Sequence, residues 1–227
     1  MPQPDRPVPR LHVLTDPAAD DRALRTVEAA LAGGAPGIQV RAKGLTDRGH
    51  LAFASAVVAR CRDAGASCIV NDRIDIALAS GADGVHLGAD DLPIRVAREL
   101  AGDRLLIGGT ARAPDTAQQA VSAGADYLGC GPLYPTSTKD GLPDPIGLDT
   151  LAAIVRAVDV PVIGISGVTA DRVVEVVATG AHGVAVTAAV NAAADPVGAT
   201  RTLLAQLAAD ALTVSTGDRD LTTDDGS

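Results

Sequence analysis

Three hydroxyl side chains and one ammonium group follow one another at Thr136, Ser137, Thr138 and Lys139, after two prolines and before a glycine. Hydroxyls donate hydrogen bonds to phosphate oxygens and lysine adds a positive charge, so this group suits a phosphorylated ligand. The connection that holds it spans about 17 residues, where 2–6 are usual between a strand and a helix. We predict a phosphate-binding loop, with a polar surface turn as the alternative.

A second polar group alternates along the chain at Gln39, Arg41 and Lys43. In a strand, positions i, i+2 and i+4 share one face, so these side chains would point the same way. Two unpaired cations in a buried strand would be costly. The pattern favours a phosphate or carboxylate ligand over a solvated edge strand.

Acidic residues follow two further apolar runs, as Asn71-Asp72 and Asp90-Asp91. Aspartate near a helix start is often a capping residue. Carboxylates at neighbouring strand ends can instead bind Mg²⁺ together with substrate phosphates and water. Both interpretations remain open from spacing alone. The cysteines and histidines show no zinc-binding spacing.

Short apolar runs that could form strands alternate with longer segments of helical periodicity, and this alternation predicts a parallel sheet. Eight such units in about 200 residues predict a single-domain α/β fold, the (β/α)8 TIM barrel, with reactive groups at the carboxyl ends of the strands. A phrase with Gly-Ala at its centre recurs four times and marks the ends of helices. The expected strands are 10–14, 37–41, 67–70, 84–87, 104–108, 126–130, 161–165 and 183–187; helical patterns cover 21–33, 46–64, 91–101, 114–123 and 170–179, and another begins near Leu148.

In this fold, the loops after the seventh and eighth strands commonly bind phosphate with backbone N–H groups at helix starts. Gly167 and Thr187-Ala188 occupy those positions. His86 ends the fourth expected strand, where a packing or supporting role is as open as catalysis. The sequence contains no nucleophile or nucleotide-binding motif of the G-x-S-x-G or Walker type.

The composition narrows the class of protein. Hydrophobic residues make up 47% of the 227 residues and the net charge is −9, which argues against nucleic-acid and membrane partners. We expect reduced cysteines and a cytoplasmic location. We expect residues 1–9 to form a flexible lead-in, residues 10–212 to form the catalytic barrel, and residues 213–227 to form a disordered tail.

Five stretches, in this order, resemble the thiamine-phosphate synthase (thiamine-phosphate pyrophosphorylase) family. They are Gln39-Val40-Arg41-Ala42-Lys43, Val70-Asn71-Asp72-Arg73, Gly84-Val85-His86-Leu87-Gly88, the segment 129–139 and the segment 161–168. The resemblance covers roughly residues 10–210 and implies a TIM-barrel transferase. That enzyme joins 4-amino-2-methyl-5-hydroxymethylpyrimidine diphosphate to a thiazole phosphate, releasing pyrophosphate and forming thiamine phosphate.

The resemblance also implies roles for individual residues. The expected catalytic group is Arg41, Lys43, Thr110 and Lys139. The pyrimidine diphosphate would be bound by Gln39, Arg41, Lys43, Asn71, Thr110 and Lys139. The thiazole phosphate, with or without a carboxyl group, would be bound by Thr136, Ser137, Thr138, Gly167, Thr187 and Ala188. The Mg²⁺ ligands would be Asp72 and Asp91. The expected partners are small phosphorylated substrates, and a homodimer is an open option.

Four positions depart from the family pattern. Thr110 replaces a usual Ser and keeps its hydroxyl, while Arg112 replaces a common His, Ala89 a usual Gln, and Ser166 a usual Gly. One alternative is a related isomerase, the thiazole tautomerase, for which a catalytic His is expected in the stretch that corresponds to Gly131-Pro132-Leu133, where this chain has Pro132. The other alternative is a non-catalytic barrel that binds phosphorylated ligands.

Overall fold

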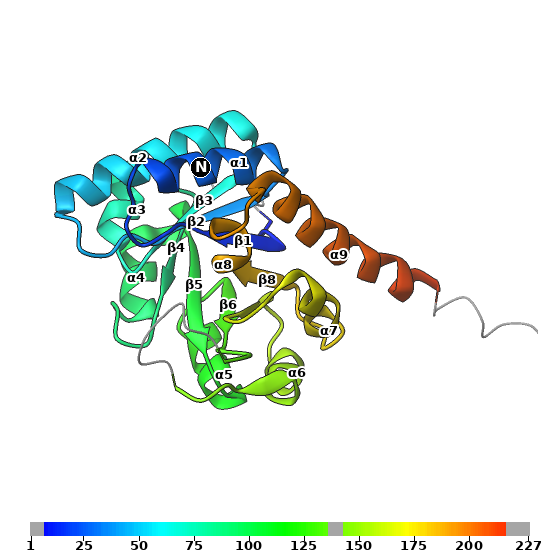
Figure 1. Cartoon of the computed structure of the whole chain (residues 1–227). Helices are drawn as coiled ribbons and strands as arrows, with labels where there is room; N and C mark the ends of the chain where they lie inside the picture. Colours follow the sequence, from blue (N-terminus) through cyan, green and yellow to red (C-terminus); the bar gives the residue numbers. More distant parts are fainter. Residues whose placement is uncertain (1–6, 136–142, 217–227) are drawn as a thin grey trace, which may run out of the picture.

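Eight parallel strands close into a barrel. The computed structural model of the chain describes residues 7–135 and 143–216. Neighbouring strands pair in sequence order, and β8 closes onto β1 (Figure 1). The predicted (β/α)8 barrel is confirmed, and each of the eight expected strands overlaps an observed strand. The strands are β1 (Leu11–Leu14), β2 (Gly37–Val40), β3 (Ser67–Asn71), β4 (Gly84–Leu87), β5 (Leu106–Ala111), β6 (Tyr127–Cys130), β7 (Val162–Ile165) and β8 (Gly183–Val186).

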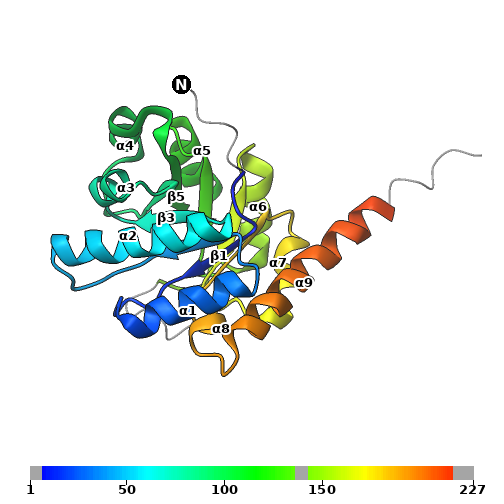
Figure 2. The same cartoon turned by 90° about the horizontal axis from the view of Figure 1, so that it is seen from above.

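Helices surround this barrel, as Figures 1 and 2 show from two directions. Short 3-10 turns at Gly102–Arg104 and Ala170–Arg172 adjoin α4 and α7. No helix in the described part of the chain is long and apolar enough to cross a membrane. The helices are α1 (Asp21–Ala32), α2 (Asp47–Ala64), α3 (Ile74–Ser80), α4 (Ile94–Ala101), α5 (Pro114–Ser122), α6 (Gly147–Ala157), α7 (Val173–Val177), α8 (Ala188–Asn191) and α9 (Pro196–Thr216).

The repeated Gly-Ala phrase ends helices in the predicted way. Its glycines, Gly34, Gly81, Gly124 and Gly180, have φ values of 94°, 71°, 104° and 90°. Glycine reaches this left-handed region without a steric penalty, so it turns the chain out of the helix. After Gly34, Gly81 and Gly124, the next residue donates back into the last helical turn, as Ala82 does to the Ala77 carbonyl at 3.1 Å. Each phrase therefore redirects the chain from a helix into the following strand.

Two apolar clusters hold the fold together. The larger one fills the space between the outer faces of the strands and the helices, with Val, Leu, Ile and Ala as its main residues. The smaller one lies inside the barrel and comprises Leu14, Ile69, Tyr127, Ile163 and Ala185. Polar side chains, including His12 and Gln39, share that interior. The inside of the barrel is therefore partly polar, and its polar side chains continue toward the carboxyl ends of the strands.

The structure describes a few residues beyond each end of the expected barrel domain, residues 7–9 and 213–216. The expected flexible lead-in ran to residue 9, but the Pro9 carbonyl accepts a hydrogen bond from His12 Nε2 at 2.9 Å, and the Val8 carbonyl accepts one from His182 Nε2 at 2.9 Å. The expected tail began at residue 213, but α9 runs to Thr216 and extends beyond the barrel in both views (Figures 1 and 2). Residues 1–6 and 217–227 lie outside the described residues.

The fifth strand also differs from the prediction. The sequence predicted 104–108, whereas β5 covers Leu106–Ala111. Thr110 is consequently part of the strand, paired with Gly129 of β6, and not part of the loop that follows it. Since Gly108 and Thr110 are two residues apart, both face the barrel interior.

Candidate active site

The side chains of Gln39 and Asn71 meet at the carboxyl ends of β2 and β3. Gln39 is 3% exposed, and its amide nitrogen donates a hydrogen bond to the Asn71 side-chain oxygen. The two residues approach because Gln39 pairs with Ile69, two positions before Asn71 on the same face of β3. The Asn71 amide N–H groups make no hydrogen bond to another described residue, so they are available to a ligand.

Two cations follow Gln39. Thr15 Oγ1 accepts a hydrogen bond from the Arg41 backbone N at 2.9 Å and donates one to its carbonyl at 3.0 Å, which fixes Arg41 to the end of β1. The Arg41 guanidinium makes no ion pair with another described residue. Lys43 Nζ lies 2.8 Å from Asp72 Oδ2. The prediction that both cations continue a strand is wrong, because β2 ends at Val40 and they lie in the loop that follows.

Two carboxylates, Asp72 and Asp91, face each other beside Lys43. Asp72 has φ +67°, a left-handed conformation that aspartate tolerates better than most residues. Asp91 Oδ2 accepts a hydrogen bond from the Gly88 backbone N at 2.7 Å. Burial, and then the nearby charge of Asp72, raises the pKa of Asp91. The two carboxylates thus lie close enough for the charge of one to affect the other.

This pair fits the predicted Mg²⁺ site better than the capping alternative. Helix α4 begins at Ile94 and has no side-chain cap, so Asp91 does not cap it. Mg²⁺ is usually bound by one or two carboxylates, with substrate phosphates and water as its other ligands. In the described ranges, no group of three His, Cys, Asp or Glu forms a complete protein site for a metal. The residues therefore suit a hard cation whose coordination a phosphorylated substrate completes.

A row of polar side chains connects the barrel interior with its mouth. His86 Nδ1 lies 3.2 Å from the Tyr127 hydroxyl, and His86 Nε2 lies 3.1 Å from Thr110 Oγ1. Tyr127 is 1% exposed, whereas Thr110 is exposed. Burial lowers the pKa of His86 to about 4, so its imidazole is neutral near pH 7. His86 therefore has a supporting contact with a predicted site residue.

Sequence reasoning did not single out Tyr127. The sequence could have indicated it, because Tyr127 and Gly129 are two positions apart on β6 and therefore face the same, inward side of the strand. An aromatic residue in that position is unusual in a chain with one Phe and two Tyr. Its partner His86 could be placed at a strand end, but the contact between them depends on the register of three strands.

The loops after β6 and β7 lie against each other. The backbone N atoms of Leu133 and Tyr134 donate to the carbonyls of Ile165 and Ser166 at 3.0 and 3.2 Å. Ser166 and Gly167 have φ values of +72° and +73°. A methyl group on Gly167 would lie 2.7 Å from Tyr134 Cβ, so this close approach requires glycine.

One further cluster flanks Gly167. The Arg172 guanidinium donates to the Gly167 carbonyl at 2.7 Å and lies 4.3 Å from the centre of the Tyr134 ring. The Tyr134 hydroxyl donates to a Glu175 carboxylate oxygen. Thr187 and Ala188 are located where β8 gives way to the short helix α8. Three of the predicted phosphate-binding residues, Gly167, Thr187 and Ala188, thus lie at the ends of β7 and β8.

The predicted loop residues Thr136, Ser137, Thr138 and Lys139 lie outside the described residues. The two ends of their connection meet, because the Ile146 backbone N donates to the Pro132 carbonyl at 2.8 Å. Arg112, one of the departures from the family pattern, donates from its guanidinium to the Asp144 carbonyl at 2.7 Å. The loop therefore begins and ends at the same face of the barrel as the residues above.

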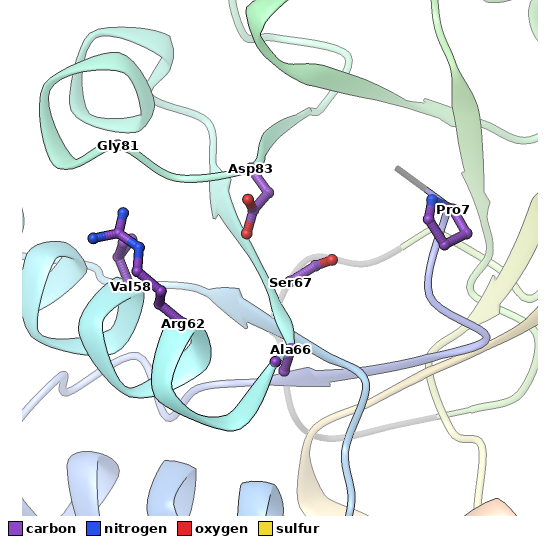
Figure 3. A pocket seen from close by; sticks show the side chains of 8 residues that line it. Pro7, Val58, Arg62, Ala66, Ser67, Gly81 and Asp83 are labelled. Carbon is purple, nitrogen blue, oxygen red and sulfur yellow. The ribbon is translucent and has the colours of Figure 1, made fainter. Parts of the chain in front are cut away.

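A hollow of about 310 Å³ lies at the opposite end of the barrel. Ser67, at the start of β3, and Asp83, just before β4, belong to its lining together with Arg62 and Pro7 (Figure 3). The Asp83 carboxylate accepts a hydrogen bond from the Cys68 backbone N at 2.7 Å. Reactive groups in this fold gather at the carboxyl ends of the strands, so the hollow is separate from the candidate site.

Comparisons with known proteins show the family to which the chain belongs. The model of a family described as thiamine monophosphate synthase matches residues 11–190. The thiamine-phosphate synthase of Salinispora arenicola is 51% identical over 194 residues, which cover 84% of this chain and 93% of that protein. The corresponding protein of Natronomonas pharaonis is 49% identical over 188 residues, covering 82% and 88%. The solved thiamine phosphate pyrophosphorylase of Pyrococcus furiosus is 38% identical, with a TM-score of 0.81 and coverage of 88% and 96%.

Proposed function

Because the chain belongs to the thiamine monophosphate synthase family, we propose that it forms thiamine phosphate from two phosphorylated precursors. One is 4-amino-2-methyl-5-hydroxymethylpyrimidine diphosphate, and the other is 4-methyl-5-(2-phosphoethyl)thiazole or its carboxylated form. The observation that carries the proposal is the meeting of Gln39 with Asn71 and of Lys43 with Asp72 at one end of the barrel. Amides, cations and carboxylates are there in the combination that a diphosphate and its counter-ion need.

The proposed reaction breaks the bond between the methylene carbon of the pyrimidine and a diphosphate oxygen. Pyrophosphate leaves with the bonding electron pair, and the thiazole nitrogen supplies the pair for the new carbon–nitrogen bond. The electron-rich aminopyrimidine stabilises the cation that forms between these events. Such a substitution requires no nucleophile from the protein, and the main tasks of the site are orientation and charge stabilisation.

Arg41, Lys43 and Lys139 would neutralise the negative charge that grows on the departing diphosphate. Gln39, Asn71 and Thr110 would orient the pyrimidine diphosphate with hydrogen bonds. Bound Mg²⁺, with Asp72 and Asp91 as its protein ligands, would supply further stabilisation of that charge. The strength of these contacts should increase as the bond breaks, which lowers the barrier more than it aids ground-state binding.

The thiazole phosphate would bind on the other side of the mouth. Gly167, Thr187 and Ala188 offer backbone N–H groups near the ends of β7 and β8, and the hydroxyls of Thr136, Ser137 and Thr138 would complete its contacts. Loops after these two strands are the common phosphate site of the fold. The half of the site made by β2 to β5 would then bind the electrophile, and the other half the nucleophile.

The test is a two-substrate assay with Mg²⁺ that measures both pyrophosphate and thiamine phosphate. We expect equal amounts of the two products and none when either substrate is omitted. Arg41→Gln should lose most turnover, whereas Arg95→Gln should keep it, since Arg95 is 75% exposed on α4 and pairs with Glu99. Ligand binding without pyrophosphate release would favour a non-catalytic barrel. Conversion of the thiazole alone would favour a tautomerase.

A further inference from the structure

The hydrogen bonds between Tyr127, His86 and Thr110 have a direction that the surrounding groups determine. The Tyr127 hydroxyl is inside the barrel, and within the described ranges its only hydrogen-bond partner is His86 Nδ1. A neutral imidazole carries its proton on one ring nitrogen and accepts at the other. The position of the imidazole proton therefore determines whether each ring nitrogen of His86 donates or accepts a hydrogen bond.

The two possible tautomers differ in what they leave unpaired. If Nδ1 carried the proton, it would donate to the Tyr127 oxygen, and the phenol proton would be buried without an acceptor. A buried donor without an acceptor loses the hydrogen bond that water gives it in the unfolded chain, and this destabilises the fold. If the Tyr127 hydroxyl donates to Nδ1, the buried phenol proton and the imidazole proton both have acceptors, and only the hydroxyl proton of the exposed Thr110 has none in the row. The second arrangement is favoured, so the imidazole proton belongs on Nε2.

An Nε2 proton points at Thr110. His86 Nε2 then donates to Thr110 Oγ1 across 3.1 Å, and the threonine oxygen is an acceptor in this contact. The Thr110 hydroxyl has a single proton, which is consequently free to bond elsewhere. Thr110 is exposed at the barrel mouth and has no other side-chain hydrogen bond among the described residues, so its proton is available to a bound molecule.

The barrel makes room for this arrangement with two glycines. A methyl group on Gly108 would lie 2.2 Å from Tyr127 Cζ and 2.5 Å from His86 Nδ1. A methyl group on Gly129 would lie 2.8 Å from His86 Cε1. Gly108 pairs with both His86 and Tyr127 across β4, β5 and β6. The contact between the two rings is thus built into three adjacent strands.

We propose that His86 is a positioning residue that donates from Nε2 to Thr110 and so directs the Thr110 hydroxyl proton toward an acceptor atom of the pyrimidine diphosphate. The substrate identity rests on the function proposed above; the direction of the hydrogen bond does not. An acceptor of this kind is a diphosphate oxygen or an unprotonated ring nitrogen, whereas the amino group of the pyrimidine would be a poor partner for it. Thr110 would therefore help to select the orientation of the substrate.

The direction is tested first without substrate. Full-length protein labelled with ¹⁵N in its histidines has four imidazoles, and the signals of His86 are identified by their loss in His86→Gln. Proton–nitrogen correlation spectra distinguish the two neutral tautomers. We expect the proton of His86 on Nε2. A proton on Nδ1 would overturn the inference, whatever the protein catalyses.

The role is tested with a matched pair of variants, His86→Gln and His86→Met, whose side chains have similar length. Only glutamine keeps an N–H donor near the Nε2 position. We expect His86→Met to lower kcat/KM for the pyrimidine diphosphate on the order of tenfold or more, the effect of losing one hydrogen bond to a charged group. His86→Gln should recover most of that loss, and KM for the thiazole phosphate should stay unchanged in both. Equal losses in the two variants would refute the positioning role.

A double-mutant cycle separates action through Thr110 from a general effect on the core. In a Thr110→Val background, His86→Met should reduce turnover by less than about twofold, because the group it positions is already absent. Full additivity of the two losses would contradict the inference. A wild-type protein that releases no pyrophosphate would reject the proposed function alone, since the tautomer measurement still decides the direction of the hydrogen bond.

Discussion

Lowering the pH from 7 to 5 should destabilise the barrel through His12. This side chain is 1% exposed, and burial, aided by the nearby His86 and His182, lowers its pKa from 6.5 to about 3. The hydrogen bond to the Pro9 carbonyl opposes this shift without cancelling it. Between pH 6.5 and 3, the unfolded chain therefore binds one more proton at this residue than the folded chain does.

The sign and size of the effect follow from proton linkage. The free energy of unfolding falls as the pH falls wherever the unfolded state binds more protons, by about 1.36 kcal/mol per pH unit and proton. From pH 7 to 5, His12 should thus remove about 2 kcal/mol of stability. His86, whose pKa burial lowers to about 4, should remove a similar amount, so these two residues together remove about 4 kcal/mol. His50, whose pKa burial also lowers, adds to the loss. Most carboxylates titrate below this range, although the raised pKa of Asp91 opposes part of the loss.

Urea unfolding at pH 7, 6 and 5 measures this dependence. The wild-type protein should lose stability steadily over the range, and His12→Gln, which cannot titrate at this position, should lose about 2 kcal/mol less. The comparison uses each protein's own value at pH 7, so a general cost of the substitution cancels. If His12→Gln showed the same slope as the wild type, the buried neutral histidine would not be the cause. A His12 imidazole that protonates near pH 6.5 in the folded protein would also exclude it as the cause.

Three further predictions concern the site. Asp72→Ala should lose most pyrophosphate release at ordinary Mg²⁺ concentrations. The control Asp90→Ala, which removes an exposed neighbouring carboxylate, should keep it. Near-normal turnover of Asp72→Ala would reject the metal assignment. Lys139→Ala should reduce turnover by roughly a hundredfold or more, and Thr136→Ala should chiefly raise KM for the thiazole phosphate; single-turnover kinetics would expose a reversed assignment. Ser166→Gly should raise the free energy of unfolding by about 1 kcal/mol in urea titrations, because φ +72° is strained for serine, and an unchanged value would argue against strain.

The barrel could be predicted because its evidence is local and repeated. Each Gly-Ala phrase combines a left-handed turn with the start of a buried strand, and both features can be read without knowing the partner strands. The chemistry at the strand ends was also accessible. Asn71 and Asp72 follow a clear apolar run, so their location at the carboxyl end of β3 depends only on the strand assignment.

The expected fifth strand, 104–108, ended three residues too early, before Gly109. Gly108 and Gly109 lie inside β5, and both are needed for packing: a methyl group on Gly109 would lie 2.6 Å from Ile94 Cδ1, and one on Gly108 would meet Tyr127. Adjacent glycines normally signal a loop. Here they signal close approach by side chains from other elements, and that information belongs to the tertiary structure.

The same distinction explains which half of the site is harder to foresee. Gln39, Asn71 and Thr110 belong to β2, β3 and β5, so their side-chain directions follow from strand parity once the register is known. Ser166 and Gly167 instead depend on left-handed backbone conformations held by contacts with the loop after β6. The alternation of side chains along a strand gives no information about such a loop. The first group should therefore be coupled to the stability of the barrel, since its polar contacts continue into the core, whereas changes in the second group should act more on ligand affinity.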